Sequence, residues 1–334
     1  MEFLFAPMEG VTGYVYRRVH ARFYPGVSRY YAPFFSPSGD HHFPLRGLKD
    51  LLPEENPGVR LVPQLLTNKA EDFIWAAASL MDRGYGEVDL NLGCPSGTVV
   101  AKRKGSGFLL LPEELDVFLE KVFAAPELKG LGISLKTRIG FAEEGEFPPL
   151  LEIYRKYPLS RLIVHPRLRA DYYKGPVHPE AFAPALEGSP FPVVWNGDVF
   201  SPADLDALRR RFPALETVML GRGLAAEPGL AGRLAFGTPC SRETLHEFHE
   251  ALSEEYRSVL YGETALCHRM KELWSYLILH FEGGERHFKR LTKAKRWGEF
   301  HLASEAVFAE LPLREDAAMP GLSTYTDKTS DRKG

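Results

Sequence analysis

A single cysteine occupies a position where its chemistry could be used. It stands in the segment Asn91-Leu-Gly-Cys94-Pro95, directly after a short apolar run. A thiol at the end of a buried strand acts as a nucleophile when it is ionised, and donates a proton when it stays neutral. An isolated cysteine is also commonly a small buried hydrophobe. The spacing alone leaves both interpretations open.

Two cations follow the next apolar run. Lys136 and Arg138 are two residues apart, so on a strand their side chains point to the same face. A structural ion pair would explain them. A lysine there would also stabilise the negative charge that a reduced flavin ring carries near N1 and O2.

The loop after Cys94 is the most basic short run in this part of the chain. It contains Lys102, Arg103 and Lys104, followed by Gly-Ser-Gly. A solvated surface loop is the ordinary interpretation. Because the loop is close to the thiol in sequence, it could also bind a polyanion that approaches the thiol.

Two later loops have the composition of a phosphate site. They read Asn196-Gly-Asp198 and Gly221-Arg222-Gly223. Glycine lets a ligand approach the backbone, and arginine grips a phosphate with two parallel donors. Each loop alone could be an ordinary turn, but the two together favour phosphate binding. His165 ends the run before them, where a hydrogen-bonded core histidine is the commoner finding.

The elements that must position these residues alternate along the first two-thirds of the chain. Strands are predicted at Phe3–Met8, Ser28–Pro33, Leu61–Leu65, Glu87–Leu90, Gly132–Thr137, Arg161–His165, Pro192–Trp195 and Thr217–Leu220. Amphipathic helical patterns separate most of them, which predicts an α/β fold, a TIM (β/α)8 barrel. An open doubly wound sheet is the alternative, but Ala-Pro-Met-Glu-Gly follows the first strand in place of a glycine-rich dinucleotide fingerprint.

Polar side chains gather where the predicted strands end. They are Glu9, Gln64, Asn91, Lys136, Arg138, His165, Asn196, Asp198 and Arg222. In a barrel these carboxyl ends form one rim, and barrel active sites lie there.

After Pro239 the strand-like runs stop and helical patterns replace them. Helices are predicted at Ser241–Tyr261, Glu263–Phe281, Glu285–Trp297 and Glu299–Leu311. The predicted domains are therefore a catalytic barrel at 1–239, an all-helical domain at 240–311 and a disordered polar tail at 312–334.

Composition sets limits on the partners. The 334 residues include 41 Lys+Arg against 44 Asp+Glu, a net charge of −3, and 44% are hydrophobic, which is typical of a globular protein. This balance argues against binding nucleic acid through bulk charge alone. The stretch from His268 to Trp297, however, carries eight Lys or Arg against three Glu, a local charge of +5.

The cations of that stretch repeat with interleaved aromatic residues. Lys289, Lys293 and Arg296 recur at three- and four-residue spacing, which predicts one face of a helix. A solvated helix face would explain the charges. The combination with aromatic residues favours a local nucleic-acid surface.

Three cysteines, scattered along the chain, predict neither a disulfide framework nor a metal site. The amino-terminal sequence does not read as a signal peptide, and no apolar run is long enough for a membrane span. A cytoplasmic, monomeric protein without a metal is expected.

Taken together, the residues resemble the dihydrouridine synthase family. The motifs that carry the resemblance are Ala6-Pro-Met-Glu-Gly-Val-Thr12, Pro63-Gln64-Leu65, Asp89-Leu-Asn91-Leu-Gly-Cys94-Pro95, Lys104-Gly105-Ser106-Gly107, Leu135-Lys136-Thr-Arg138, Val164-His165-Pro-Arg167, Trp195-Asn196-Gly197-Asp198 and Met219-Leu-Gly221-Arg222-Gly223. They cover about residues 3–300, and Met270-Lys271 matches the family's basic helix segment.

The resemblance implies an FMN-dependent barrel enzyme that uses NADPH to reduce the C5–C6 double bond of uridine in RNA, usually tRNA. Cys94 would give a proton to C5. Cofactor contacts would come from Pro7, Met8, Glu9, Gln64, Lys136, His165, Asn196, Gly197, Asp198, Gly221 and Arg222. Substrate and RNA contacts would come from Asn91, Lys102, Arg103, Lys104, Arg138, Lys271, Lys289, Lys293 and Arg296.

Three segments depart from the family pattern. Gly13 stands where the family commonly has Asp, residues 96–104 replace the usual context after Cys-Pro, and the insertion Phe34–Asn56 is long. These departures leave ribosomal RNA open as the substrate. Two further alternatives are a flavin barrel acting on a free pyrimidine or an enone, and a non-catalytic RNA-binding protein.

Overall fold

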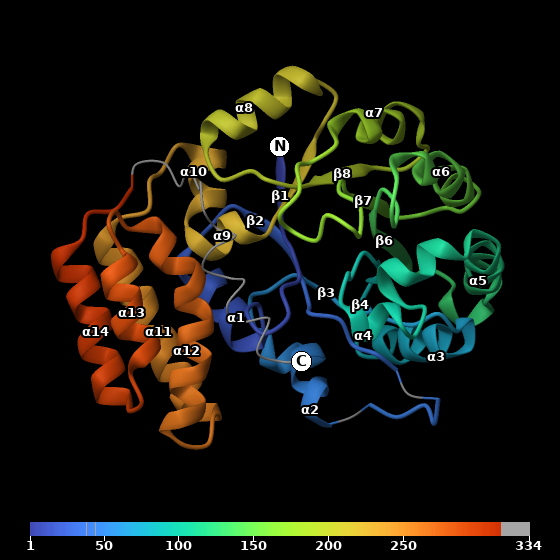
Figure 1. The fold of residues 1–334 in the computed structure, drawn as a ribbon. Helices are drawn as coiled ribbons and strands as arrows, with labels where there is room; N and C mark the ends of the chain where they lie inside the picture. The colour runs from blue at the N-terminus through green and yellow to red at the C-terminus, as the bar shows by residue number, and fades with distance from the viewer. Residues whose placement is uncertain (38, 44, 315–334) are drawn as a thin grey trace. The chain divides into compact units, whose positions relative to one another are not determined.

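The computed structural model describes residues 1–37, 39–43 and 45–314. Its centre is a nine-stranded parallel sheet in the order β3-β2-β1-β9-β8-β7-β6-β5-β4 (Figure 1). The strands are β1 (Glu2–Phe5), β2 (Val27–Tyr31), β3 (Leu61–Val62), β4 (Gln64–Leu65), β5 (Glu87–Leu92), β6 (Gly132–Arg138), β7 (Arg161–His165), β8 (Val193–Asn196) and β9 (Thr217–Leu220). Every strand predicted from the sequence is present.

The two end strands of this order are consecutive in the chain, and only Pro63 separates them. β3 pairs with β2, where Tyr30 lies opposite Leu61, and β4 pairs with β5, where Gln64 lies opposite Asp89. Proline has no N–H for a ladder, but the Pro63 carbonyl accepts a hydrogen bond of 2.9 Å from the Asp89 amide. β3 and β4 therefore act as one interrupted strand that closes the sheet. The prediction of a TIM-barrel fold is confirmed.

The barrel interior is filled by side chains from strands around the ring. One buried cluster comprises Leu4, Ala6, Tyr31, Val62, Ile163, Val194 and Met219. Such a packed layer makes the barrel a solid core rather than a pore, so the chemistry must lie at the strand ends.

The helices are α1 (Tyr14–Phe23), α2 (Leu45–Leu48), α3 (Ala70–Met81), α4 (Gly97–Val100), α5 (Pro112–Ala124), α6 (Phe147–Arg155), α7 (Pro179–Gly188), α8 (Pro202–Arg211), α9 (Arg222–Ala226), α10 (Leu230–Phe236), α11 (Arg242–Val259), α12 (Glu263–Leu277), α13 (Glu285–Lys293) and α14 (Trp297–Glu310). Local signals set several of these bounds. Ser201 caps α8, because its hydroxyl accepts a hydrogen bond of 3.1 Å from the Asp204 amide. Pro112 occupies the first turn of α5 with two glutamates after it, as the helix dipole favours.

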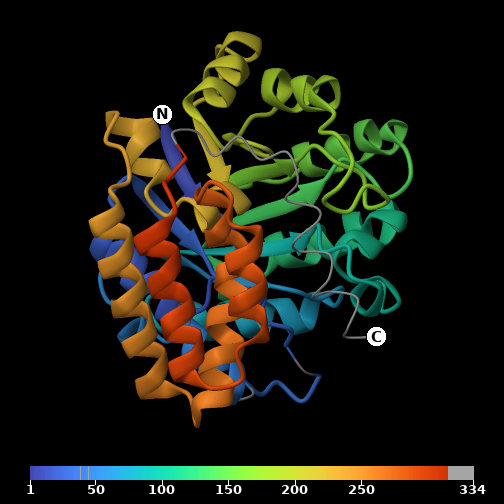
Figure 2. The same ribbon diagram turned by 60° about the vertical axis from the view of Figure 1, so that its left-hand side comes forward.

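The last four helices pack side by side (Figure 2). Gly262 separates α11 from α12, and Gly283 lies just before α13; both glycines have positive φ. Trp274 of α12 is fully buried, and its ring meets that of Phe308 on α14 edge to face at 5.6 Å. No helix in the described ranges is both long and apolar enough to cross a membrane.

The third predicted helix of this region is wrong at its end. The sequence predicts one helix over Glu285–Trp297, but α13 stops at Lys293, because Ala294 leaves the helical conformation with ψ of 132°. Arg296 is therefore the extended residue just before α14, with φ −117° and ψ 153°. Lys289 and Lys293 share a helix with one another, but not with Arg296.

Part of the tail that was predicted to be disordered is paired. Leu313 forms an antiparallel bridge with Phe281, and the Arg314 amide donates to the His280 carbonyl at 2.9 Å. The rest of the predicted tail, 315–334, lies outside the described residues.

The chain forms two compact units that interleave in sequence. The first contains Met1–Pro7, Ser28–Gly197 and Arg209–Met219, and the second contains Met8–Val27, Asp198–Leu208 and the chain from Leu220. Within the second unit, α1 packs against α11, where Tyr16 and Phe248 meet edge to face at 5.7 Å. The functional division at residue 239 stays a prediction.

Candidate active site

A buried carboxylate anchors a chain of hydrogen bonds inside the first unit. Asp89 on β5 is fully buried and accepts from the Ser134 hydroxyl at 2.7 Å and from Gln64 Nε2 at 2.7 Å. An ionised carboxylate can only accept, so the Gln64 amide must turn its nitrogen towards Asp89. Gln64 Oε1 then accepts from Asn91 Nδ2 at 2.8 Å. One carboxylate thus sets the orientation of both amides.

The far end of this chain is the loop that carries the thiol. Asn91 Oδ1 accepts from the backbone amides of Gly93 at 3.0 Å and Cys94 at 2.9 Å. This is an Asx-type turn, in which a short amide side chain holds the backbone just after it. The Cys94 side chain is half-buried at the end of β5. Its position follows from Asn91, and the Asn91 orientation follows from Asp89.

The glycine-rich segment after the thiol holds the other side of that loop. The Cys94 carbonyl accepts from the Ser106 amide at 3.1 Å and from its hydroxyl at 2.8 Å. Gly105 has φ +56°, and a Cβ there would lie 2.9 Å from the Cys94 carbonyl oxygen. Glycine is required here on both counts. The motif therefore fixes the backbone of Cys94.

Lys136 on β6 lies opposite Asn91 in the sheet register and is half-buried. Burial, and after it the neighbouring Arg138 charge, lowers the pKa of its ammonium to about 8, against the opposing charges of Asp89 and Cys94. The described residues give its ammonium no hydrogen-bond or ion-pair partner. Lys136 is thus a cation held near its titration range and ready for a ligand.

Asp89 itself titrates near neutrality. Burial raises the pKa of its carboxyl to about 7, against the hydrogen bonds from Gln64 and Ser134 and the charge of Lys136, which lower it. Desolvation dominates because the group has no access to water. Asp89 was not among the site residues predicted from the sequence, where it appeared only as part of a motif. Its two-residue spacing from Asn91 was the available signal, since alternate strand residues share a face.

Arg138, expected to contact substrate or RNA, is 1% exposed. Its Nε donates to the Gly93 carbonyl at 2.9 Å, and a terminal nitrogen donates to the Leu168 carbonyl at 2.8 Å. The guanidinium is therefore engaged with the backbone on both sides, and one of its partners is the residue before Cys94. Arg138 therefore supports the thiol loop, and its expected contact with substrate or RNA stays a prediction.

The candidates that follow β7 and β8 are also buried. His165 Nε2 faces a terminal nitrogen of Arg167 at 3.2 Å. Since an arginine can only donate, that imidazole nitrogen is the acceptor. Asn196 Nδ2 donates to the Met219 carbonyl at 2.9 Å, and a Cβ at Gly197 would lie 3.1 Å from the indole nitrogen of Trp195.

The remaining cofactor candidates lie in or next to the second unit. Arg222 pairs with Asp198 at 2.7 Å, directly after Gly221. The turn that contains Met8 and Glu9 is closed by Thr12, whose hydroxyl accepts from the Met8 amide at 2.8 Å. Pro7 and Met8 are half-buried, and Glu9 is exposed.

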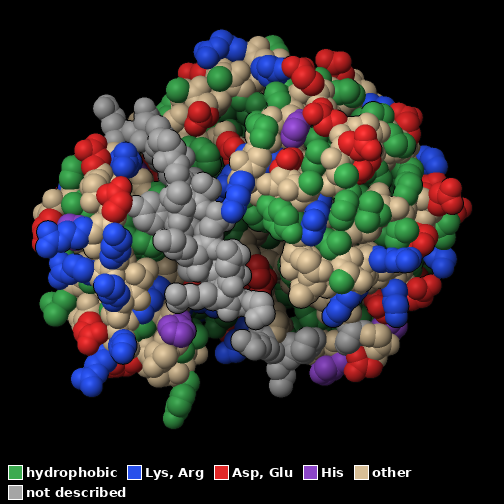
Figure 3. All heavy atoms as spheres, in the orientation of Figure 1, with side chains coloured by type: hydrophobic (Ala, Val, Ile, Leu, Met, Phe, Trp, Pro, Cys, Tyr) green, Lys and Arg blue, Asp and Glu red, His purple; other side chains and the backbone are tan. Residues whose placement is uncertain are grey.

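The expected RNA contacts divide by exposure. Lys289, Lys293 and Arg296 are exposed, and Figure 3 shows Lys and Arg side chains gathered over α13. Lys271 instead donates its ammonium to the Ala294 carbonyl at the end of α13, so it serves as a helix cap.

The basic loop of the first unit divides in the same way. Lys102 and Arg103 are exposed, and Arg103 lies 3.9 Å from Glu114. Lys104 is half-buried, donates to the Ser36 hydroxyl at 3.2 Å and has its pKa lowered by burial. Lys102 and Arg103 are thus the more accessible cations of this loop.

Comparison of the sequence with known proteins identifies the family to which the chain belongs. The family model for dihydrouridine synthase (Dus) matches residues 4–305. The chain is 28% identical over 277 residues to "Probable tRNA-dihydrouridine synthase 1" of Synechocystis sp., covering 81% of this chain and 72% of the relative. It is 30% identical over 243 residues to "Probable tRNA-dihydrouridine synthase" of Staphylococcus epidermidis, covering 68% of this chain and 69% of the relative. A protein of Rhizobium leguminosarum bv. phaseoli with the same name is 31% identical over 64% of this chain and 67% of its own. The chain belongs to the dihydrouridine synthase family.

Proposed function

We propose that this protein reduces the C5–C6 double bond of uridine in tRNA, with FMN as its flavin, NADPH as its reductant and Cys94 as the proton donor. As a dihydrouridine synthase the chain is a flavin-dependent oxidoreductase that forms dihydrouridine in tRNA. The identity of the flavin and of the nicotinamide, and the residue roles below, are our proposals.

The observation that carries the flavin assignment is the state of Lys136. It is a half-buried ammonium for which the described residues show no partner, and it lies opposite Asn91, which hydrogen-bonds to the buried amide of Gln64. A cation and an amide are the donor set that fits the N1 and O2 edge of a flavin ring. When bound there, the flavin supplies hydride for C6 of the pyrimidine. Lys136, which is largely protonated at pH 7, stabilises the negative charge that reduction places on the ring.

Cys94 delivers the proton that completes the reduction. Hydride addition at C6 leaves negative charge at C5, and a neutral thiol held by the Asn91 turn gives its proton there. Asn91 presents its own amide group at the same strand end, so it also positions the uracil ring. Proton transfer from a positioned group contributes about 10²–10⁴-fold to a rate.

The other end of the cofactor is assigned to small and charged residues. We assign the ribityl chain and phosphate to His165, Asn196, Gly197, Asp198, Gly221 and Arg222, and the flavin-facing loop to Pro7, Met8 and Glu9. Arg222 is already paired with Asp198, so a phosphate would join an existing ion pair.

We assign RNA binding to exposed cations. The exposed cations that could meet phosphates are Lys289 and Lys293 on α13, Arg296 before α14, and Lys102 and Arg103 of the loop after the thiol, where Arg103 also lies 3.9 Å from Glu114. Backbone contacts of this kind would offset the cost of unstacking the target base, which is about a few kcal/mol. A protein acting as a monomer in the cytoplasm fits this assignment.

The test uses tRNA from cells that lack their own dihydrouridine synthases. Purified wild-type protein with NADPH should form dihydrouridine at defined tRNA positions, mapped by mass spectrometry, and faster than with NADH. Cys94→Ala should keep its flavin, and flavin reduction by NADPH, while dihydrouridine formation in a single turnover falls about 10²-fold or more. Cys240→Ala, which removes the other partly exposed thiol, is the matched control.

Three outcomes would contradict the proposal. Purified protein without flavin would remove the redox role, and dihydrouridine in ribosomal RNA alone would move the substrate. Equal turnover by Cys94→Ala and wild type would remove the thiol from the reaction.

A further inference from the structure

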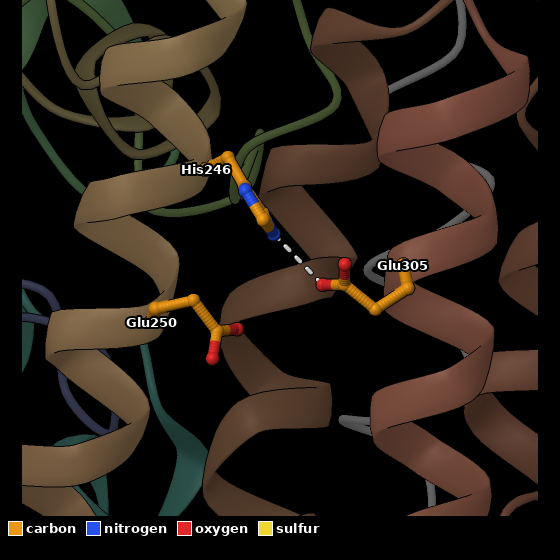
Figure 4. Close-up of side chains that lie close together, drawn as sticks. All are labelled: His246, Glu250 and Glu305. Atoms are coloured by element: carbon orange, nitrogen blue, oxygen red, sulfur yellow. Dashed lines mark hydrogen bonds and ion pairs between the residues drawn. The ribbon is translucent and has the colours of Figure 1, made fainter.

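Two helices of the second unit each present a histidine and a glutamate one turn apart. His246 and Glu250 are four residues apart on α11, and His301 and Glu305 are four residues apart on α14. Residues at this spacing lie on one helix face. Figure 4 shows His246 and Glu250 projecting from one helix towards Glu305 on the facing helix. The two pairs are cross-matched, with the histidine of each helix near the glutamate of the other.

The potential ligand atoms of this cluster converge. One atom each of His246, Glu250 and Glu305 lies within 4.8 Å of the other two. His246 Nε2 is 2.8 Å from Glu305 Oε1, and His301 Nδ1 is 3.8 Å from Glu250 Oε1. His301 Nδ1 is enclosed and has no hydrogen-bond partner among the described residues, so it is a possible fourth ligand atom at the rim of the same cluster.

Neighbouring side chains hold these groups in a state that can bind a cation. His249, 1% exposed, lies with its Nδ1 3.0 Å from Glu250 Oε1 and so fixes the position of that carboxylate. Contacts of this kind orient carboxylate ligands in metal sites. The Phe308 ring packs against that of His246, with ring centroids 4.7 Å apart.

We propose that His246 Nε2 and the carboxylates of Glu250 and Glu305 bind a divalent transition-metal ion of the Zn²⁺ class, with His301 or water completing the shell. Imidazole and carboxylate together favour such an ion over Ca²⁺ or Mg²⁺. In a tetrahedral zinc site the ligand atoms lie about 2 Å from the metal, hence about 3.3 Å from one another.

Reaching that geometry requires only side-chain movement. The widest separation, up to 4.8 Å, must shrink by about 1.5 Å, and the His246–Glu305 separation must widen slightly. All three side chains are partly exposed and can rotate. The bound ion would tie α11 to α14, the first and last helices of the bundle. No metal site was expected from the sequence, because that expectation rested on the spacing of the cysteines alone.

The experiment measures metal binding directly. Chelator-treated, dialysed full-length protein is titrated with Zn²⁺ against a competing fluorescent chelator, and with Co²⁺ as a visible-absorbing probe. We expect one equivalent to bind with a dissociation constant in the micromolar range or tighter. We also expect a rise in the unfolding temperature that the chelator reverses. His246→Gln and Glu305→Gln, each close in size to the original, should weaken binding at least tenfold.

A second His–Glu pair supplies a matched control. His287 Nε2 on α13 lies 2.8 Å from Glu310 Oε2 on α14, the same distance as the His246–Glu305 contact. No third His, Cys, Asp or Glu among the described residues completes that pair into a metal-binding group. His287→Gln should therefore leave Zn²⁺ affinity unchanged.

The inference does not depend on the proposed enzyme activity, because both readouts come from metal titration and thermal unfolding. Binding in the millimolar range only, or equal loss of affinity in the His287 control, would overturn it. If the substituted proteins fail to fold, the wild-type titration alone still decides, since the absence of a tight stoichiometric site refutes the proposal.

Discussion

Replacement of Asp89 by asparagine tests the buried amide chain and the stability of the barrel together. Asp89 has its carboxyl pKa raised from 3.8 to about 7 by burial. The folded state therefore binds the proton more tightly than the unfolded chain does. Stability from this group is complete below about pH 4 and is lost as pH rises towards 7. Above pH 7 the ionised group costs about 4 kcal/mol, because the pKa rises by about 3 and a change of one in pKa corresponds to about 1.36 kcal/mol.

The magnitude to be measured is a difference between two pH values. At pH 8 nearly the whole cost is present, whereas at pH 5 less than half of it is. Asp89→Asn carries no such charge, although it loses one acceptor worth about 1–3 kcal/mol. The wild type should thus lose about 2–3 kcal/mol of unfolding free energy relative to the Asp89→Asn protein between pH 5 and pH 8. Denaturant unfolding of both proteins at both pH values measures this difference.

The same substitution should reduce catalysis even where it adds stability. The amide introduced by Asp89→Asn can offer an N–H to Gln64, which removes the reason for Gln64 Oε1 to face Asn91. Asn91 would then no longer be obliged to accept from the Cys94 amide. We expect single-turnover dihydrouridine formation to fall about tenfold or more, since small displacements of reacting groups have effects of this size. A stability difference that is equal at pH 5 and pH 8, together with unchanged turnover, would refute the reasoning.

Three further variants test other parts of the proposal. Lys289→Glu combined with Lys293→Glu should weaken tRNA binding and flatten its salt dependence, with flavin reduction by NADPH unchanged; Lys129→Glu, an exposed cation of the first unit, is the control, and equal weakening by it would point to overall charge. Arg222→Ala should lower the flavin content of the purified protein, and full occupancy would argue against the phosphate assignment. Gly105→Ala should destabilise the fold by about 1–2 kcal/mol and slow turnover, because its Cβ would lie 2.9 Å from a backbone carbonyl and its φ is +56°; wild-type kinetics would show that the loop adapts.

The barrel could be predicted because its signals are local. Apolar runs with amphipathic helices between them mark the strands, and the polar side chains at their ends mark the rim. The interruption at Pro63 was not predicted, because a proline within an apolar run does not reveal which neighbour each half will pair with. Register depends on contacts far apart in the chain.

The site was predicted less completely, for a related reason. Residue types identified Cys94, Lys136 and Gln64. The importance of Asp89 depends on the burial of its carboxyl group, and the spacing of residues in the sequence does not reveal burial. Arg138 and Lys271 were assigned to substrate or RNA from their charge and from the family resemblance, and the structure shows that both also donate to backbone carbonyls. Long cationic side chains can hydrogen-bond to backbone carbonyls of the protein as readily as they bind RNA phosphates. Only the contacts in the folded structure distinguish these two roles.

The interruption at Pro63 also gives the barrel a seam. The β2–β3 and β4–β5 ladders join two residue pairs each, whereas β5 and β6 are joined over six. Local opening should therefore begin at the seam, and its amides should exchange with solvent first. The Gln64–Asp89 and Asn91–Gln64 hydrogen bonds join β4 to β5 beside one of these two-pair ladders. The residues that orient the thiol loop thus also help to keep the barrel closed. A ligand that binds Gln64 should therefore slow amide hydrogen exchange along both short ladders.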